Sequence, residues 1–383
     1  MKSKMNPMPD NEPQNPFEYT RPIVDKERYI PRVGMVQNII NELYGKNNVS
    51  VMGAKRTGKT TLLFDLRERL DRAVYIDFKK FSYSDIGEVL SDLHKNADKQ
   101  ISNTFDELIV EDGNSTHALV KMLHVLGECA PVVFLIDELP TPREVAYQFL
   151  VAVRAYYLEA IAESAEKIHT FVIAGSVDLA VLTQDMNPDI SPFNIAIPLY
   201  LKDFSYPEIQ EFIHRLAVGR FEDREIEKIF RYTGGYPFLV QFVCHHLYGM
   251  TKGKREEILQ KPDIAVRELP LEKTPSIKDM LGRIGAFDER DRPGAVLIKR
   301  ILRGERVLFN FANKQILGLY LDGAIREDED GYCAIRNPLY EVVLRRALDI
   351  PNAEEPEKVV PEKGTGRKSG RRKIPGRIIE IYG

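Results

Sequence analysis

One short segment of this chain has the residue types and spacing of a phosphate-binding loop (P-loop). Residues 53–60 fit the pattern GxxxxGK[ST] at every position. Its two glycines let the backbone turn so that N–H groups point into one cavity, and a following helix would add its positive N-terminal end. The pattern predicts a nucleotide site in which Lys59 contacts the β- and γ-phosphates and the Thr60 hydroxyl ligates Mg²⁺. A glycine loop that only turns the chain would not need Lys-Thr at this place. The candidate binding residues are Gly53, Ala54, Lys55, Arg56, Thr57, Gly58, Lys59, Thr60 and Thr61.

A second segment supplies two adjacent carboxylates. Residues 132–138 read VVFLIDE, an apolar run that ends in Asp137 and Glu138. The C-terminal edge of the strands is where α/β sheets bind ligands. We interpret Asp137 as a Mg²⁺ ligand that acts through a water molecule, and Glu138 as the catalytic residue that polarises the attacking water. Taken alone, the run could be a strand that meets solvent, but its position downstream of a P-loop favours the functional interpretation.

A third apolar run, residues 171–174, is followed by Gly175 and Ser176. In P-loop ATPases, a strand beside the one with the acidic pair ends in a polar side chain that senses the γ-phosphate. Ser176 occupies that position and would be the catalytic sensor. The alternative is an ordinary turn at the end of a strand.

These residues need a scaffold, and the chain predicts alternating strands and helices between residues 22 and 250. Short apolar runs rich in β-branched residues predict strands at 48–52, 73–78, 132–136, 168–174 and 195–199. Stretches with helical periodicity predict helices at 59–70, 142–163, 206–216 and 237–248. Alternating strands and helices indicate an α/β domain with a parallel sheet. The near-continuous apolar run 132–136 suits a central strand buried on both faces.

The C-terminal part of the chain has a different pattern. Residues 251–275 are charged, which indicates a connector. After a helical stretch, two short runs at 324–327 and 332–335 flank an Asp-Gly pair, which is a hairpin signal. Residues 337–348 predict a last helix. Helices followed by a hairpin and a final helix indicate a winged-helix unit.

Composition excludes several classes of protein. The 383 residues predict two or three domains, and the 43% hydrophobic and 29% charged residues are ordinary soluble values. Because the net charge is −3, no global basic field marks the chain as a nucleic-acid binder. No apolar run approaches the roughly 18 residues of a membrane span, and the N-terminus lacks the apolar core of a secretory signal. The three cysteines form no CxxC pair, so a reducing cytoplasm is the expected compartment.

With these motifs in place, the sequence resembles the prokaryotic AAA-like P-loop ATPases of the STAND class, in the branch of archaeal-type predicted ATPases. Besides the P-loop and the acidic pair, the segments that carry the resemblance are Asn15-Pro16-Phe17, Tyr29-Ile30-Pro31-Arg32, Ala174-Gly175-Ser176, Ser191-Pro192-Phe193-Asn194, Leu201-Lys202-Asp203-Phe204-Ser205, Gly234-Gly235-Tyr236-Pro237 and Asn337-Pro338-Leu339. The P-loop is common to many families, whereas its combination with Gly-Gly-x-Pro is more specific. Pro31 departs from the glycine that the family favours, and the chain lacks the long repeat array that many STAND proteins use for sensing.

The resemblance implies a fold and a set of roles. It implies an AAA-like core in which the strand before Ser176 lies between the P-loop strand and the strand before Asp137. A helical lid would close over the nucleotide, and a winged helix would follow. The implied ligand is ATP with Mg²⁺, with Arg32 near the base or ribose and Pro237 near the adenine. The predicted division is a flexible segment at 1–19, a P-loop ATPase core at 20–202, a helical lid and connector at 203–270, a winged-helix domain at 271–350 and a disordered basic tail at 351–383.

Three functions fit these features. The preferred one is an ATP-hydrolysing switch in which ATP closes the lid and winged helix against the core and hydrolysis releases them. The first alternative is a DNA-associated ring ATPase or loader, which would work as a homo-oligomer and needs an arginine from a neighbouring copy. The second is an ATP-gated DNA-binding regulator. DNA would contact the winged helix and the tail, where residues 367–377 hold six positive charges. No membrane partner is expected.

Overall fold

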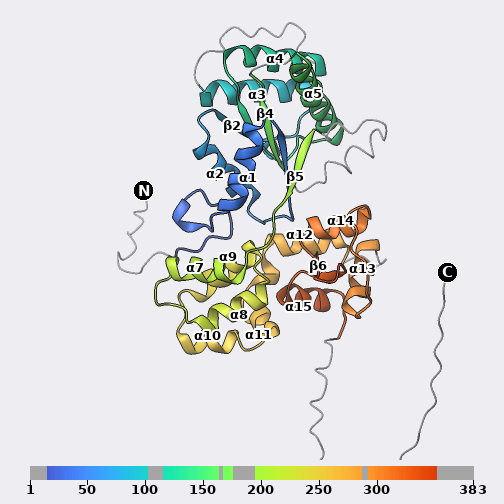
Figure 1. Ribbon diagram of the computed structural model, residues 1–383. Helices are drawn as coiled ribbons and strands as arrows, with labels where there is room; N and C mark the ends of the chain where they lie inside the picture. The colour runs from blue at the N-terminus through green and yellow to red at the C-terminus, as the bar shows by residue number, and fades with distance from the viewer. Residues whose placement is uncertain (1–14, 102–114, 164–166, 176–194, 287–291, 352–383) are drawn as a thin grey trace, which may run out of the picture. The chain divides into compact units, whose positions relative to one another are not determined.

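A five-stranded parallel sheet carries the site, with its strands in the order β2-β3-β4-β1-β5 in the computed structural model (Figure 1). The structure describes residues 15–101, 115–163, 167–175, 195–286 and 292–351. The strands are β1 Asn48–Met52, β2 Ala73–Asp77, β3 Val133–Asp137, β4 Thr170–Gly175 and β5 Ala196–Tyr200. The expected order is confirmed, because β4 pairs with β1 on one side and with β3 on the other. The P-loop and the acidic pair therefore leave the sheet at the same edge, one strand apart.

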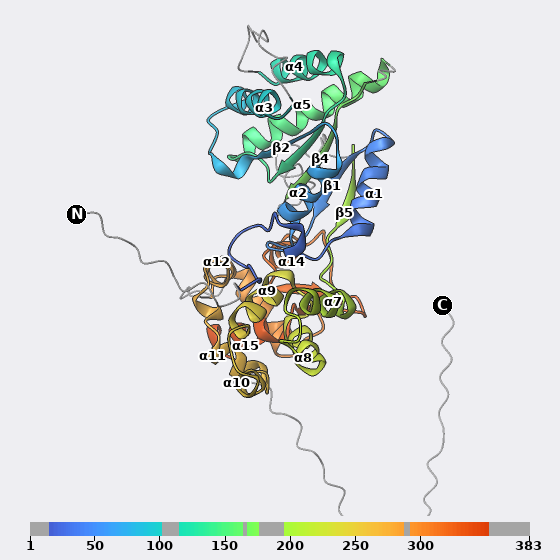
Figure 2. The ribbon, with the colours of Figure 1, turned by 90° about the vertical axis from the view of Figure 1, so that its left-hand side faces the viewer.

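The two faces of the sheet are covered by different helices. These are α1 Val33–Tyr44, α2 Lys59–Arg69, α3 Ile86–Ile101, α4 Thr116–Cys129 and α5 Arg143–Ala162. Figure 2 shows α3, α4 and α5 on one side of the sheet and α1 on the other. Because successive side chains of a strand point to opposite faces, Phe134 and Ile136 pack with α3, α4 and α5, whereas Leu135 packs with α1 and α2. Helices α3, α4 and α1 were not predicted, while the predicted strands and helices end within two residues of the observed ones.

Helices continue after β5 through a region that was only partly predicted. They are α7 Tyr206–Leu216, α8 Asp223–Thr233, α9 Pro237–Leu247, α10 Lys252–Ile258 and α11 Pro262–Glu268. Helix α7 starts with a capping box, in which the Ser205 N–H donates to Glu208 Oε2 at 2.7 Å. The stretch 251–275, expected to be a connector, instead forms α10, α11 and the 3₁₀ turn Leu271–Lys273. These short helices are held because apolar side chains such as Ile258 and Val266 are buried in the core.

The C-terminal segment, which we define as residues 275–347, contains α12 Pro275–Ile284, α13 Pro293–Leu302, α14 Lys314–Leu321, β6 Ile325–Glu327, β7 Cys333–Ile335 and α15 Pro338–Ala347. The predicted hairpin is present, with β6 and β7 paired antiparallel from Ile325 opposite Ile335. The apolar side chains of this segment share one hydrophobic cluster with those of α7–α11. The two regions therefore stabilise each other through a common core.

Residues 15–19, which the sequence places in a flexible segment, are part of the packed structure. Phe17 is 1% exposed and contacts the rings of Phe212 and Phe221 edge-on. The Asn15 side chain donates to the His245 carbonyl at 2.8 Å. The start of the described chain is therefore attached to α7 and α9 rather than solvated.

Candidate nucleotide-binding site

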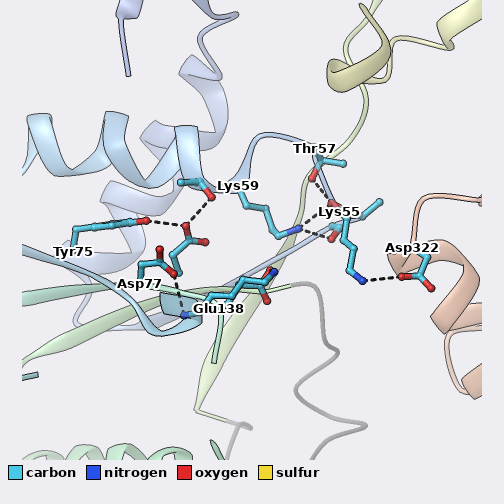
Figure 3. Close-up of polar contacts among 12 residues, drawn as sticks. Lys55, Thr57, Lys59, Tyr75, Asp77, Glu138 and Asp322 are labelled. Atoms are coloured by element: carbon cyan, nitrogen blue, oxygen red, sulfur yellow. Dashed lines mark hydrogen bonds and ion pairs between the residues drawn. The ribbon is translucent and has the colours of Figure 1, made fainter. Parts of the chain in front are cut away.

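The P-loop connects β1 to α2 in a conformation that depends on its glycines. Gly58 caps α2 with a left-handed φ of +92°, which costs glycine little. A Cβ on Gly53 would lie 3.1 Å from Thr57 Oγ1 and 3.2 Å from the Leu201 Cβ, tighter than most side chains accept. The Thr57 hydroxyl donates to the Ala54 carbonyl at 2.8 Å, which ties the loop to itself (Figure 3).

Lys59 places its charge inside the loop. The residue is 6% exposed, and its Nζ donates to the carbonyls of Gly53 and Ala54, each at 2.9 Å (Figure 3). Burial lowers the pKa of Lys59 to about 8, while the nearby charges of Glu138 and Asp137 act in the opposite direction. A buried cation inside a ring of backbone groups is the arrangement that an anionic phosphate would stabilise.

Asp137 lies at the end of β3 and is held by two hydroxyl groups. The Thr60 Oγ1 donates to Asp137 Oδ2 at 2.7 Å, and the Tyr75 hydroxyl donates to the same oxygen at 2.9 Å (Figure 3). The carboxylate is 6% exposed, and burial raises its pKa despite these two hydrogen bonds. The sequence analysis named Thr60 and Asp137 but missed Tyr75, which lies on the neighbouring strand β2.

The oxygen groups of Thr60 and Asp137 fit a magnesium ion. Mg²⁺ prefers oxygen ligands and is commonly bound through one or two carboxylates, water and substrate phosphates. Within the described residues, no group of three or more His, Cys, Asp or Glu side chains forms a complete protein cage for a metal. A Mg²⁺ ion at this edge would therefore be shared with the nucleotide, with Thr60 and Asp137 as the protein contribution.

Glu138 follows β3 in an unusual backbone conformation. Its φ is +62°, in the left-handed region that side chains other than glycine rarely adopt, and its N–H donates to the Ala174 carbonyl at 2.7 Å. Such strain costs roughly 1–2 kcal/mol and is found at functional sites. Lys79, in a 3₁₀ turn that directly follows β2, lies with its Nζ 3.5 Å from Glu138 Oε1. The sequence analysis gave Lys79 no role.

A cavity of about 540 Å³ opens over the P-loop. Lys59, Thr60, Asp137 and Glu138 line it. Further parts of its wall come from segments that are far apart in sequence, among them residues 18–23, 29, 30, 32, 236–238 and the C-terminal segment. Of the predicted binding residues, Lys55 to Thr61, Arg32 and Pro237 all line this cavity, whereas Gly53 and Ala54 form the loop behind it. Ser176 lies outside the described residues.

Arg32 links the P-loop to the segment after β5. Its Nη2 donates to the Thr57 carbonyl at 3.1 Å and its Nη1 to the Lys202 carbonyl at 2.9 Å. The guanidinium lies 4.2 Å from the centre of the Phe204 ring, a cation–π distance. Burial lowers the pKa of Arg32 to about 10. These contacts fix the wall of the cavity, and they use the guanidinium for the protein's own backbone.

The C-terminal segment contacts the P-loop directly at Lys55. The Lys55 N–H donates to the Leu321 carbonyl at 2.8 Å, and Lys55 Nζ lies 3.0 Å from Asp322 Oδ1 (Figure 3). Arg283 Nε donates to the same Asp322 oxygen at 2.6 Å. The Tyr236 hydroxyl donates to the Lys55 carbonyl, so both polar ends of this residue are held. No sequence signal marked Asp322, Arg283 or Tyr236 as neighbours of the loop.

The fold and site together define the class of protein. The chain belongs to the AAA-like domain family, whose model matches residues 22–266. Its fold is that of a P-loop NTPase with an AAA-like core. No curated protein matches the chain. Within the described residues, no helix combines the length and apolar character that crossing a membrane requires.

Solved structures with a similar fold share little sequence identity with this chain. The Walker-type ATPase of Pyrococcus abyssi aligns over 85% of this chain and 99% of its own, with a TM-score of 0.57 and 17% identity. The ORC2 protein of Aeropyrum pernix, solved as ADPNP–ADP complexes, aligns over 87% and 97% with a TM-score of 0.47 and 13% identity. AMPPCP-bound DnaA from Aquifex aeolicus aligns over 87% and 89% with a TM-score of 0.38 and 15% identity. At such identities the likeness concerns the fold.

Proposed function

We propose that this protein binds ATP with Mg²⁺, hydrolyses it, and uses the nucleotide state to control how its C-terminal segment contacts the P-loop. The observation that carries the proposal is the ion pair between Lys55, inside the P-loop, and Asp322, at the end of α14. In this chain the loop that would hold the phosphates is also the docking point of a distant segment. A change in the charge or position of Lys55 would therefore affect Asp322, and the reverse.

The negative charge of Asp322 predicts how ATP would change this contact. Asp322 is anionic and lines the same cavity as Lys59 and Thr60. A γ-phosphate would bring further negative charge into that cavity, compete for Lys55 and repel Asp322. ADP has no γ-phosphate, so it would compete for Lys55 and repel Asp322 less strongly. ATP would therefore weaken the docking of the C-terminal segment and hydrolysis would restore it, the reverse of the direction expected from the sequence. This is a two-state switch in which ATP binds one state better than the other.

The roles of the remaining parts follow from this proposal. Lys59 would contact the β- and γ-phosphates, Thr60 and Asp137 would hold Mg²⁺, and Glu138 would polarise the attacking water. When bound, Mg²⁺ neutralises charge on the phosphates. Ser176 would be the γ-phosphate sensor. Residues 203–270 would act as the lid and 271–350 as a winged-helix domain of the STAND type. The buried free thiols of Cys244 and Cys333 suit a reducing, cytoplasmic location.

The described surface gives less support to a DNA-binding function. The hairpin of β6 and β7 has Glu327 at the end of β6 and Asp328, Glu329 and Asp330 in its turn. Negative charge at this place would repel the phosphate backbone of DNA. A DNA contact would instead depend on the basic residues 367–377, which lie outside the described residues. We therefore keep the ring ATPase and the DNA-binding regulator as alternatives to the switch.

Zero-length cross-linking tests the switch with the native residues. A carbodiimide joins an amine to a carboxylate only when the two are in contact, as Lys55 and Asp322 are here. With ATP turnover established by phosphate release, the Lys55–Asp322 cross-link should form readily with ADP and decrease with Mg²⁺ and a non-hydrolysable ATP analogue. The exposed pair Lys254–Glu257 serves as the control for reagent efficiency. An equal yield with both nucleotides would contradict the switch.

A mass measurement separates the switch from the ring ATPase. The protein would be weighed in solution with and without ATP and Mg²⁺. A constant monomer is compatible with the switch and eliminates the ring. An ATP-dependent oligomer that lacks the change in the Lys55–Asp322 cross-link would favour the ring.

A further inference from the structure

Tyr75 is fixed in space by contacts from three parts of the fold. On one side, its strand pairs with β3, where Tyr75 lies opposite Leu135. On the other side, its backbone N–H donates to Gln100 Oε1 at 3.0 Å and its carbonyl accepts from Gln100 Nε2 at 2.9 Å. Its ring packs against Phe64 of α2, with 4.8 Å between the ring centres. The side-chain amide of α3 thus completes the outer edge of β2 at this residue.

The hydroxyl of this fixed ring reaches the carboxylate at the end of the next strand. Asp77 pairs with Asp137 in the sheet, and Tyr75 lies two residues before Asp77. Because alternate side chains of a strand point to the same face, Tyr75 lies on the same face of β2 as Asp77. Its hydroxyl donates to Asp137 Oδ2 at 2.9 Å, the oxygen that also accepts from Thr60 at 2.7 Å (Figure 3). Both donors use one oxygen, so neither of them engages Oδ1.

We infer that Tyr75 is a positioning residue for the metal site, which holds the Asp137 carboxylate in the orientation that a Mg²⁺-bound water requires. This inference rests on the proposed function, because it concerns the same Mg²⁺·ATP site. Tyr75 acts through Asp137 and is absent from the residues that line the nucleotide cavity. Hydrogen-bond partners of metal ligands orient those ligands, and their loss commonly lowers metal affinity by about 10–100-fold.

The two donors differ because Thr60 has a second role. In the proposed complex its hydroxyl oxygen would also ligate Mg²⁺ through a lone pair, so the position of Thr60 would be shared between the ion and Asp137. Tyr75 contacts neither the ion nor the nucleotide, so its bond can persist through the whole cycle. The tyrosine therefore maintains the carboxylate orientation in the free protein and in both nucleotide states.

The test is Tyr75→Phe, which removes only the hydroxyl. ATP affinity would be measured by calorimetry in EDTA and at a series of MgCl₂ concentrations, and Mn²⁺ binding would be measured by electron paramagnetic resonance. We expect the Mg²⁺ concentration for half-maximal enhancement of ATP binding to rise at least about tenfold. Mn²⁺ affinity should fall by a similar factor, whereas ATP affinity in EDTA should not change.

Tyr83→Phe is the matched control. Tyr83 donates to Asp92 Oδ2 at 2.8 Å, so this variant loses the same kind of tyrosine–aspartate hydrogen bond, on the opposite face of the sheet and without touching Asp137. In this variant the Mg²⁺ dependence of ATP binding and the affinity for Mn²⁺ should equal those of the wild type.

Two results would overturn the inference. One is an unchanged Mg²⁺ dependence in Tyr75→Phe. The other is a loss of ATP affinity that is equal in EDTA and in Mg²⁺ and accompanies a lower melting temperature, because the hydroxyl would then only stabilise the fold. A wild-type protein that binds no ATP under either condition would instead contradict the proposed function, so the two failures are distinguishable.

Discussion

Gly235 lies directly against the backbone of Phe204. The Phe204 N–H donates to the Gly235 carbonyl at 3.0 Å, and a Cβ on Gly235 would lie 2.0 Å from the Phe204 carbonyl oxygen. Gly235 also has a φ of +75°. Two independent constraints thus require glycine here. The close approach seats Tyr236 and Pro237 beside the P-loop, which gives the Gly-Gly-x-Pro motif its structural meaning.

We predict that Gly235→Ala destabilises the protein by about 2–4 kcal/mol, because the side chain adds a backbone clash to the strain of positive φ. Denaturant unfolding followed by circular dichroism would measure the change. Gly219→Ala is the matched control, since its φ is +68° and nothing lies within 4 Å of the added Cβ. It should lose only about 1 kcal/mol. Equal losses in the two variants would show that the contact with Phe204 is unimportant.

Lys59→Ala should weaken ATP binding by about 100-fold or more, because it removes the buried charge facing the phosphates, and a hydrogen bond to a charged group contributes about 1.5–3 kcal/mol. Calorimetric titration with ATP and Mg²⁺ measures the loss. Lys252→Ala removes a surface lysine paired with Glu222 and should bind ATP normally. Retained affinity in Lys59→Ala would refute the assignment of residues 53–60 as the phosphate site.

Glu138→Gln should bind ATP normally and hydrolyse it at least about 10²-fold more slowly, the usual scale for losing a general base. Phosphate release under single-turnover conditions separates the chemical step from binding. Glu144→Gln, an exposed change in the first turn of α5, should hydrolyse at the wild-type rate. If Glu138→Gln turned over like the wild type, another group would have to activate the water.

Asp322→Asn should shift nucleotide preference toward ATP. The neutral side chain no longer repels a γ-phosphate, so the ratio of ADP to ATP dissociation constants should rise about tenfold, a coupling of about 1.4 kcal/mol. Competition binding with both nucleotides gives the ratio. Asp330→Asn, which removes an exposed partner of Arg306 on the hairpin, is the control. A ratio unchanged by Asp322→Asn would mean that Asp322 does not sense the third phosphate.

Stability should fall in mild acid because of His169. This residue is fully buried before β4 and accepts a hydrogen bond from the Val132 N–H at its Nδ1, 2.9 Å away. Burial, together with the charges of Arg72 and His124, lowers its pKa from 6.5 to about 4. Below pH 6.5 the unfolded chain therefore binds a proton that the folded chain does not, so stability is lost as the pH falls toward 4.

The expected loss is about 3 kcal/mol, at 1.36 kcal/mol for each pH unit between the two pKa values. It would be measured by urea unfolding at several pH values. His169→Asn keeps an acceptor for Val132 and lacks the titrating ring, so its stability should depend less on pH between 6.5 and 4. Parallel profiles for the two proteins would mean that His169 does not contribute.

Much of the site could be predicted from local sequence. The P-loop pattern and the apolar run before Asp137 depend on contacts between neighbours in the chain, such as the turn that needs Gly58 and the strand that needs β-branched residues. These preferences act over a few residues and are visible in any short window. The strands and helices built from them were therefore located to within two residues.

What only the tertiary structure decided is which distant residues meet these segments. Lys55 and Asp322 are 267 positions apart, and Tyr75 lies 62 positions before Asp137. The chain offers 57 acidic residues, and nothing in the local sequence distinguishes Asp322 from the rest. Such pairs are selected by how strands pair and helices pack, because a hydrogen bond or ion pair forms only where the whole core brings two groups within about 3 Å. The candidate phosphate site could therefore be predicted from a short motif, whereas the contact of its loop with the C-terminal segment and the hydrogen bond from Tyr75 to Asp137 arise from the packing of the whole chain.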